Sequence, residues 1–78
     1  MKARLEVFLK ETVLDPQGKT IKNALKNLGF TQVNDLRVGK IFYIDLNIED
    51  KEKAKKMVEE MAEKLLCNKI IESYKVHL

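Results

Sequence analysis

The spacing of the apolar residues changes along this chain from a period of two to a period of about 3.6 and back, and this change limits the possible folds most. Residues 3–10, ARLEVFLK, alternate between apolar and polar side chains, which predicts a half-buried strand. Apolar residues then recur at helical spacing from Ile21 to Leu28, which predicts an amphipathic helix that buries one stripe. Gly29 follows directly, at a position where a left-handed helix cap is favoured.

The middle of the chain returns to the period of two. Residues 33–38 predict a second strand, and Gly39-Lys40 suits a two-residue type II′ turn into a third strand at residues 41–48. In that third strand one face is predicted to carry Phe42, Ile44, Leu46 and Ile48, and the other Ile41, Tyr43, Asp45 and Asn47.

The last third of the chain predicts a second helix and a closing strand. Asp50 is a predicted N-cap for this helix, and the strand lies within residues 70–78. The buried stripe of the helix is predicted to consist of Ala54, Met57, Val58, Met61, Ala62 and Leu65. The inward side chains of the closing strand are predicted to be Tyr74, Val76 and Leu78.

This order of elements predicts an α+β fold. A β-α-β-β-α-β chain folds most simply as a ferredoxin-like split βαβ sandwich, with an antiparallel four-stranded sheet and two helices on one face. The 78 residues have room for one domain, so we expect residues 1–78 to form a single unit. A chain this short buries only about two thirds of its unfolded surface, so assembly with other subunits would supplement a modest core.

Composition disfavours several classes of protein. The 15 basic and 12 acidic residues give a net charge of +3, and the basic residues are spread along the chain, which does not favour a nucleic-acid partner. No apolar run is long enough to span a membrane, and the N-terminus reads as a strand rather than a signal peptide. The only cysteine, Cys67, cannot form an internal disulfide. These features together predict a cytoplasmic protein.

Residues that could carry catalysis are scarce. His77 is the only histidine, and Cys67 lies near a predicted helix C-terminus, where the helix dipole does not lower the pKa of a thiol. A metal site needs at least three ligands, and only these two soft ones are available. No glycine-rich phosphate-binding pattern occurs. We therefore expect no catalytic residue, no metal and no cofactor in this chain.

The sequence Asp15-Pro16-Gln17-Gly18 stands at the mouth of the first predicted helix and can be interpreted in two ways. Asp15 can be the N-cap with Pro16 at the first helical position. Alternatively, the four residues form a type I turn and the helix starts near Thr20. A functional interpretation is that Gly18 lets a partner or an anion approach bare backbone at the positive end of the helix.

The predicted open face of the sheet offers a further surface. Phe8, Ile41 and Tyr43 suit a sheet-to-sheet contact between copies of the chain. RNA-recognition modules stack bases on aromatic residues of such a face, but the adjacent Phe42 and Tyr43 point to opposite sides, so the match is partial. A small-molecule sensor that binds ligands between ferredoxin-like subunits is another hypothesis, which rests on analogy of fold alone.

Three segments of the chain resemble PurS, the family of small subunits of phosphoribosylformylglycinamidine synthase. They are VLDPQGKTIKNALKNLGF, LRVGKIFYIDL and LLCNKIIESYKV, and the match runs from Val13 to Val76 with the spacing between them intact. The third segment departs from the family pattern, because Lys69 stands where the family usually has proline and Ser73 where it often has an acid.

The resemblance implies a role in de novo purine biosynthesis. In the family's enzyme a glutaminase subunit releases ammonia and a large synthetase subunit uses ATP, Mg²⁺ and that ammonia to form an amidine. The small subunit is implied to associate with itself, as a homodimer or tetramer, and to bridge the two other subunits. The candidate contact residues are Phe8, Asp15, Pro16, Gln17, Gly18, Arg37, Gly39, Lys40, Ile41, Tyr43, Asn68 and Glu72.

Overall fold

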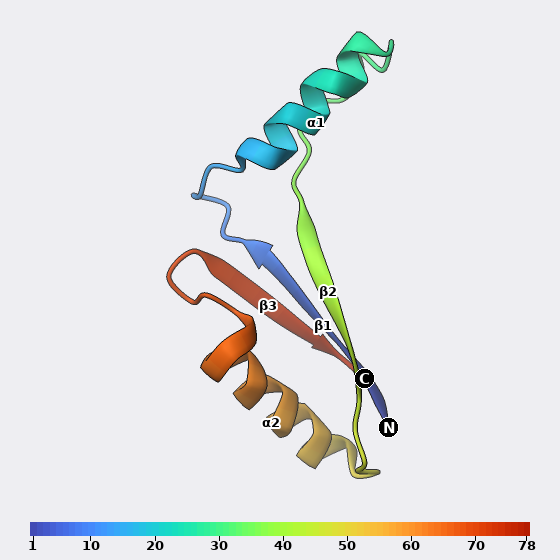
Figure 1. Cartoon of the computed structure of the whole chain (residues 1–78), viewed down its shortest axis with the longest axis vertical. Coiled ribbons are helices and arrows are strands. Elements are labelled where there is room, and N and C mark those ends of the chain that lie inside the picture. The colour runs from blue at the N-terminus through green and yellow to red at the C-terminus, as the bar shows by residue number, and fades with distance from the viewer.

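The computed structural model describes all of residues 1–78 and contains one antiparallel sheet and two α-helices (Figure 1). The sheet has three strands in the order β2-β1-β3, with β1 in the centre. In chain order the elements are β1 (Lys2–Leu9), α1 (Pro16–Asn27), β2 (Gly39–Asp45), α2 (Lys51–Met61), the π-helical turn η1 (Ala62–Leu66) and β3 (Glu72–His77).

The predicted four-stranded ferredoxin-like sheet is wrong, because residues 33–38 do not join the sheet. The pairing of β1 with β2 begins at Phe8 opposite Gly39, and β1 ends one residue later at Leu9. Residues before Gly39 therefore run past the end of β1, where no neighbouring strand can accept their backbone hydrogen bonds. Gly39 and Lys40 consequently start β2 instead of forming a hairpin turn.

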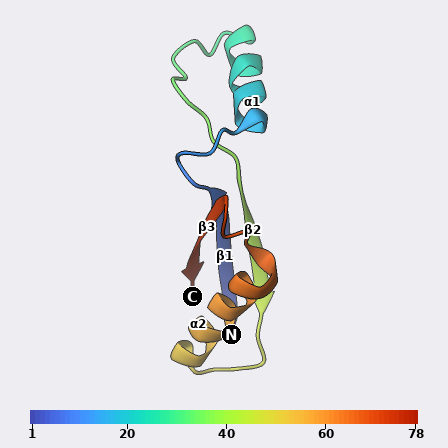
Figure 2. The ribbon, with the colours of Figure 1, turned by 90° about the vertical axis from the view of Figure 1, so that its left-hand side faces the viewer.

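The sequence predicted that both helices lie on one face of the sheet, and this prediction is wrong. Only α2 covers the sheet, whereas α1 stands beyond the end of the strands and residues 30–38 return alongside it (Figures 1 and 2). We call residues 16–35 the arm; residues 10–15 and residues 36–38 connect it to the sheet. Because the arm extends beyond the sheet, the whole molecule is elongated and measures 47 × 24 × 14 Å, with a radius of gyration of 15.8 Å. A compact chain of this length would have a radius of gyration of about 11.5 Å.

The hydrophobic core is small and lies between the sheet and α2. Leu5 and Val7 of β1 are fully buried, and Val58 of α2 packs in the same cluster. Small side chains allow the helix to approach the sheet closely, since Ala54 and Ala62 are also fully buried. The complete buried hydrophobic set is Ala3, Leu5, Val7, Leu46, Ala54, Val58, Ala62 and Cys67. None of these residues belongs to the arm.

The turn η1 changes which side chains face the core at the end of α2. The Cys67 amide donates to the Ala62 carbonyl at 3.0 Å, five residues back, so this turn is wider than an α-helical turn. Leu66 then packs against the core, while Leu65 is 83% exposed. The prediction that Leu65 is buried is therefore wrong, as are those for Met57 and Leu78, which are also exposed.

Candidate functional site

The base of the arm, where α1 and residues 36–38 meet the sheet, contains a buried carboxylate. Asp15 is only 6% exposed, and its Oδ1 accepts a hydrogen bond of 2.9 Å from the Gly18 amide. Its Oδ2 accepts a second of 2.8 Å from the Val38 amide. The first contact confirms Asp15 as the N-cap with Pro16 at the start of α1, so the alternative type I turn is not formed.

The environment of Asp15 favours its charged form. The hydrogen bond from Gly18 lowers the pKa of this carboxyl most, and the bond from Val38 lowers it further. The nearby Arg37 guanidinium acts in the same direction, while desolvation opposes the shift. Asp15 is therefore an ionised group that joins the first turn of α1 to the segment that leads into β2.

Arg37 makes the reciprocal connection at the same place. Its Nη2 donates to the Lys10 carbonyl at 3.0 Å and to the Val13 carbonyl at 2.8 Å. Both carbonyls belong to the connection between β1 and α1, whereas Arg37 belongs to the connection between α1 and β2. Thus each connection contributes one side chain that bonds to the backbone of the other: Arg37 from the second connection and Asp15 from the first.

Gly18 is buried because α1 and the returning segment approach each other closely at this point. A Cβ atom on Gly18 would overlap the carbonyl oxygen of Leu36 and would lie 2.8 Å from Asp15 Oδ2. The requirement for glycine therefore comes from space, and the approaching group is this chain's own backbone. This contact occupies the position at which the sequence suggested that a partner or an anion could approach.

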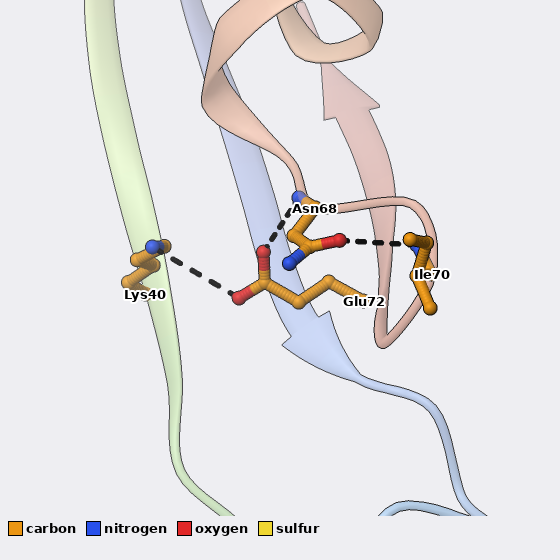
Figure 3. A network of polar contacts seen from close by, with 4 residues as sticks. All are labelled: Lys40, Asn68, Ile70 and Glu72. Atoms are coloured by element: carbon orange, nitrogen blue, oxygen red, sulfur yellow. Dashed lines mark hydrogen bonds and ion pairs between the residues drawn. The ribbon is translucent and has the colours of Figure 1, made fainter.

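A second polar network connects the starts of the two edge strands (Figure 3). Glu72 Oε1 accepts from the Asn68 amide at 2.8 Å, and Glu72 Oε2 lies 3.9 Å from Lys40 Nζ. Asn68 Oδ1 in turn accepts from the Ile70 amide at 3.2 Å, which shapes the turn before β3. In the same turn Lys69 forms an ion pair of 2.7 Å with Glu63.

Six candidate residues from different parts of the sequence line one hollow of about 410 Å³ between the arm base and the sheet. They are Phe8, Asp15, Gln17, Gly39, Lys40 and Glu72. Arg37 lines neighbouring hollows instead. The structure therefore brings the DPQG segment, the RVGK segment and the start of β3 together, although they are separated in sequence.

The outer face of the sheet forms a separate surface. Ile41 and Tyr43 are exposed there, as predicted, and Tyr43 is 78% exposed. Charged groups interrupt the apolar ones, because His77 Nε2 lies 3.0 Å from Glu6 Oε2 and Lys75 Nζ lies 5.7 Å from the centre of the Phe8 ring. This face does not form a continuous aromatic platform.

The arm presents exposed apolar side chains that the sequence analysis did not identify as contact candidates. Leu28 and Phe30 of the arm are 74% and 55% exposed, and Leu14, in the connection before α1, is 74% exposed. The helical spacing from Ile21 to Leu28 is real, but α1 makes no extensive contact with the sheet or with α2. The sequence Leu28-Gly29-Phe30 could have indicated this exposed surface. Phe30 lies after the predicted helix, so the buried stripe of that helix does not explain an apolar residue there.

The reactive side chains are dispersed. Cys67 is buried, and burial raises the pKa of its thiol, with a smaller contribution from the Glu72 carboxylate. His77 pairs with Glu6 on the opposite face of the sheet. No three histidine, cysteine, aspartate or glutamate side chains are placed to hold a metal ion together. Neither of the two helices has the length and apolarity that crossing a membrane requires.

The fold and this site define a small α+β protein that holds an apolar arm away from a minimal core. A family model for PurS, described as phosphoribosylformylglycinamidine (FGAM) synthase, matches residues 2–78. The chain belongs to this family, whose enzyme acts in purine biosynthesis.

Individual relatives agree with this assignment over almost their full length. The chain is 44% identical over 75 residues to the PurS subunit of Bacillus subtilis, covering 95% of this chain and 87% of that one. The solved structure of Methanocaldococcus jannaschii PurS superposes with a TM-score of 0.89 at 42% identity, covering 97% and 92% of the two chains. A chain in the structure of PurLQS from Thermotoga maritima has a TM-score of 0.89 at 36% identity, covering 97% and 93%.

Proposed function

We propose that this chain is a non-catalytic subunit that bridges the glutaminase and synthetase subunits of an FGAM synthase and supports the transfer of ammonia between them. The observation that carries this proposal is the arm, which neither the sheet nor α2 covers and whose Leu28 and Phe30 side chains are exposed. The likeness to a chain of the Thermotoga maritima PurLQS structure supports assembly with other subunits.

Self-association is part of the proposal. Only eight hydrophobic residues are buried in the core, and burying the arm against a second copy would add apolar area that a single chain lacks. We therefore propose a homodimer or a tetramer in which the arm forms a contact between copies. The hollow lined by Gln17, Lys40 and Glu72 lies at the base of the same arm and extends this contact toward the sheet.

The chemistry of the reaction is assigned to the other subunits. In this proposal glutamine is used by the glutaminase, and ATP and Mg²⁺ are used by the synthetase, while this chain binds none of them. The complex would work in the cytoplasm, where we expect this chain from its sequence.

The structure removes the support for the alternative hypothesis of a small-molecule sensor. That hypothesis rested on analogy with ferredoxin-like dimers, and the sheet of this protein does not have that arrangement.

The proposal is tested by reconstituting the enzyme with and without this chain. The glutaminase and synthetase of the same organism are co-expressed, and FGAM formation is measured first with glutamine and then with ammonium chloride. We expect omission of the chain to reduce the glutamine-dependent rate strongly and to leave the ammonia-dependent rate nearly unchanged. An equal glutamine-dependent rate in both preparations would show that the proposed bridging role is wrong.

A further inference from the structure

The direction of the arm relative to the sheet depends on few contacts. Two chain segments connect them, residues 10–15 and residues 36–38, and α1 does not pack extensively on any strand or on α2 (Figure 2). A helix held only by two connections would change its orientation easily, because no buried apolar surface resists the movement. The polar contacts at the arm base are therefore the groups that can fix this direction.

These contacts cross between the two connections in both directions. Arg37 of the second connection donates to the carbonyls of Lys10 and Val13 in the first. Asp15 of the first connection accepts from Val38 in the second. Each contact closes a loop of more than 20 residues, so the pair restrains two segments that the sequence separates widely.

The fit of α1 against the returning segment strengthens this restraint. Gly18 places the first turn of α1 against the Leu36 carbonyl, and further along the arm Lys22 Nζ donates to the Asn34 carbonyl at 3.3 Å. α1 and the returning segment thus contact each other along the arm, and Asp15 and Arg37 join the two connections at its base.

We propose that Asp15 and Arg37 form a latch that fixes the arm in one direction relative to the sheet. We propose further that this preorganisation sets the affinity with which the arm binds a second copy of this chain. The consequence for binding rests on the proposed function, whereas the fixed direction does not. A binding surface that already holds its bound geometry loses less conformational entropy on association than one that must be ordered first. Asp15 and Arg37 act here as positioning residues.

The direct test measures the distance between arm and sheet in variants of the latch. Spin labels are placed at the exposed sites Asn27→Cys and Lys56→Cys in a Cys67→Ala background, and labelled chains are diluted with an excess of unlabelled chains. We expect a narrow distance distribution without further substitution and a distribution about twice as wide in Arg37→Ala, because the latch no longer limits arm motion. Asp15→Asn is expected to broaden it too, since an amide has a single acceptor oxygen and can keep only one of the two bonds from Gly18 and Val38.

Controls separate position from charge. Arg4 is an exposed residue of β1, and Arg4→Ala removes one positive charge, as Arg37→Ala does. It is expected to leave the distance distribution narrow. Arg37→Lys retains a donor and is expected to recover part of the restraint. An Arg37→Ala distribution as narrow as that of the parent would overturn the latch.

Self-association is measured on the same variants without labels, by sedimentation equilibrium. We expect Arg37→Ala to weaken the association by about tenfold through the added conformational entropy. A parent chain that stays monomeric would contradict the self-association proposed above, while the width of the distance distribution would still decide the latch. A broadened distribution with unchanged affinity would overturn the claim that preorganisation sets affinity.

Discussion

At the scale of single residues, the DPQG segment has a structural explanation. Asp15 caps α1 and holds the returning segment, and Pro16 starts the helix. Gly18 is required because the Leu36 carbonyl occupies the space that a side chain would need. Residue types offered the cap as one of two interpretations, whereas the requirement at Gly18 arises from a contact with Leu36, 18 positions further along the chain.

A side chain at Gly18 is expected to destabilise the arm. Gly18→Val forces either α1 or the backbone at Leu36 to shift, and overpacking of this kind typically costs about 1–3 kcal/mol. The cost is measured as the change in opening free energy of the α1 amides by hydrogen exchange. Gln17→Ala is the matched control, because Gln17 is exposed on the same turn, and it is expected to change this free energy by less than about 0.5 kcal/mol. Equal effects of the two substitutions would contradict the steric explanation.

The stability of the arm is expected to depend on pH through Asp15. Hydrogen bonds from Gly18 and Val38 lower the folded-state pKa of Asp15 below its ordinary value of 3.8, so its contribution is fully present above that value. The contribution is lost as the pH falls from about 4 through the lowered pKa, because protonation weakens both bonds. Hydrogen exchange of α1 between pH 6 and 2.5, corrected for intrinsic rates, measures this loss. Asp15→Asn is expected to flatten the acid limb, and an unchanged limb would rule Asp15 out as its source.

At the scale of elements, the register of α2 and η1 decides which apolar residues form the core. The wide turn at Ala62–Leu66 brings Leu66 toward the sheet and leaves Leu65 in solvent. A helical period of 3.6 residues places Leu65 on the buried stripe, and the prediction failed because one turn departs from that period.

Truncation of a core residue is expected to destabilise the sheet and α2 strongly. Leu5 is fully buried in the central strand, and Leu5→Ala is expected to cost about 2–5 kcal/mol. That is a large part of the stability of a small domain, so denaturant unfolding followed by circular dichroism is expected to shift clearly. Leu65→Ala removes a similar side chain from an exposed position and is expected to shift unfolding by less than about 0.5 kcal/mol. A comparable loss from both variants would mean that Leu65 is buried.

At the scale of the whole molecule, the chain combines a small core with an arm that the core does not cover. Its radius of gyration of 15.8 Å reflects the arm (Figure 1). Apolar side chains on an uncovered element are typical of interaction surfaces, and here they lie at some distance from the core residues that stabilise the sheet.

A charge at the end of the arm is expected to weaken self-association without unfolding the chain. Leu28 follows α1 and is 74% exposed, so Leu28→Glu leaves the core unchanged while placing a charge in the proposed contact. We expect sedimentation equilibrium to show a dissociation constant raised by about tenfold or more, because desolvating an unpaired charge is unfavourable. Leu65→Glu is the control on α2's side of the molecule. Weakening by the control alone would place the contact on η1 instead of the arm.

The sequence by itself determined the elements whose signals are local. The alternation in β1, the cap at Asp50 and the exposed positions of Ile41 and Tyr43 were predicted and are confirmed. The cap at Asp15 was one of the two interpretations that the sequence left open, and it is the one formed. Capping contacts and side-chain periods involve residues within a few positions of one another, so a single sequence carries them.

Only the tertiary structure decided where the arm lies and how many strands the sheet has. Residues 33–38 were predicted as a strand, but a strand needs a neighbour, and β1 ends at Leu9 before it could provide one. The apolar stripe of α1 predicts burial without naming what covers it, and neither the sheet nor α2 covers it. Both outcomes depend on the lengths and positions of distant segments, which the local pattern of residues does not encode.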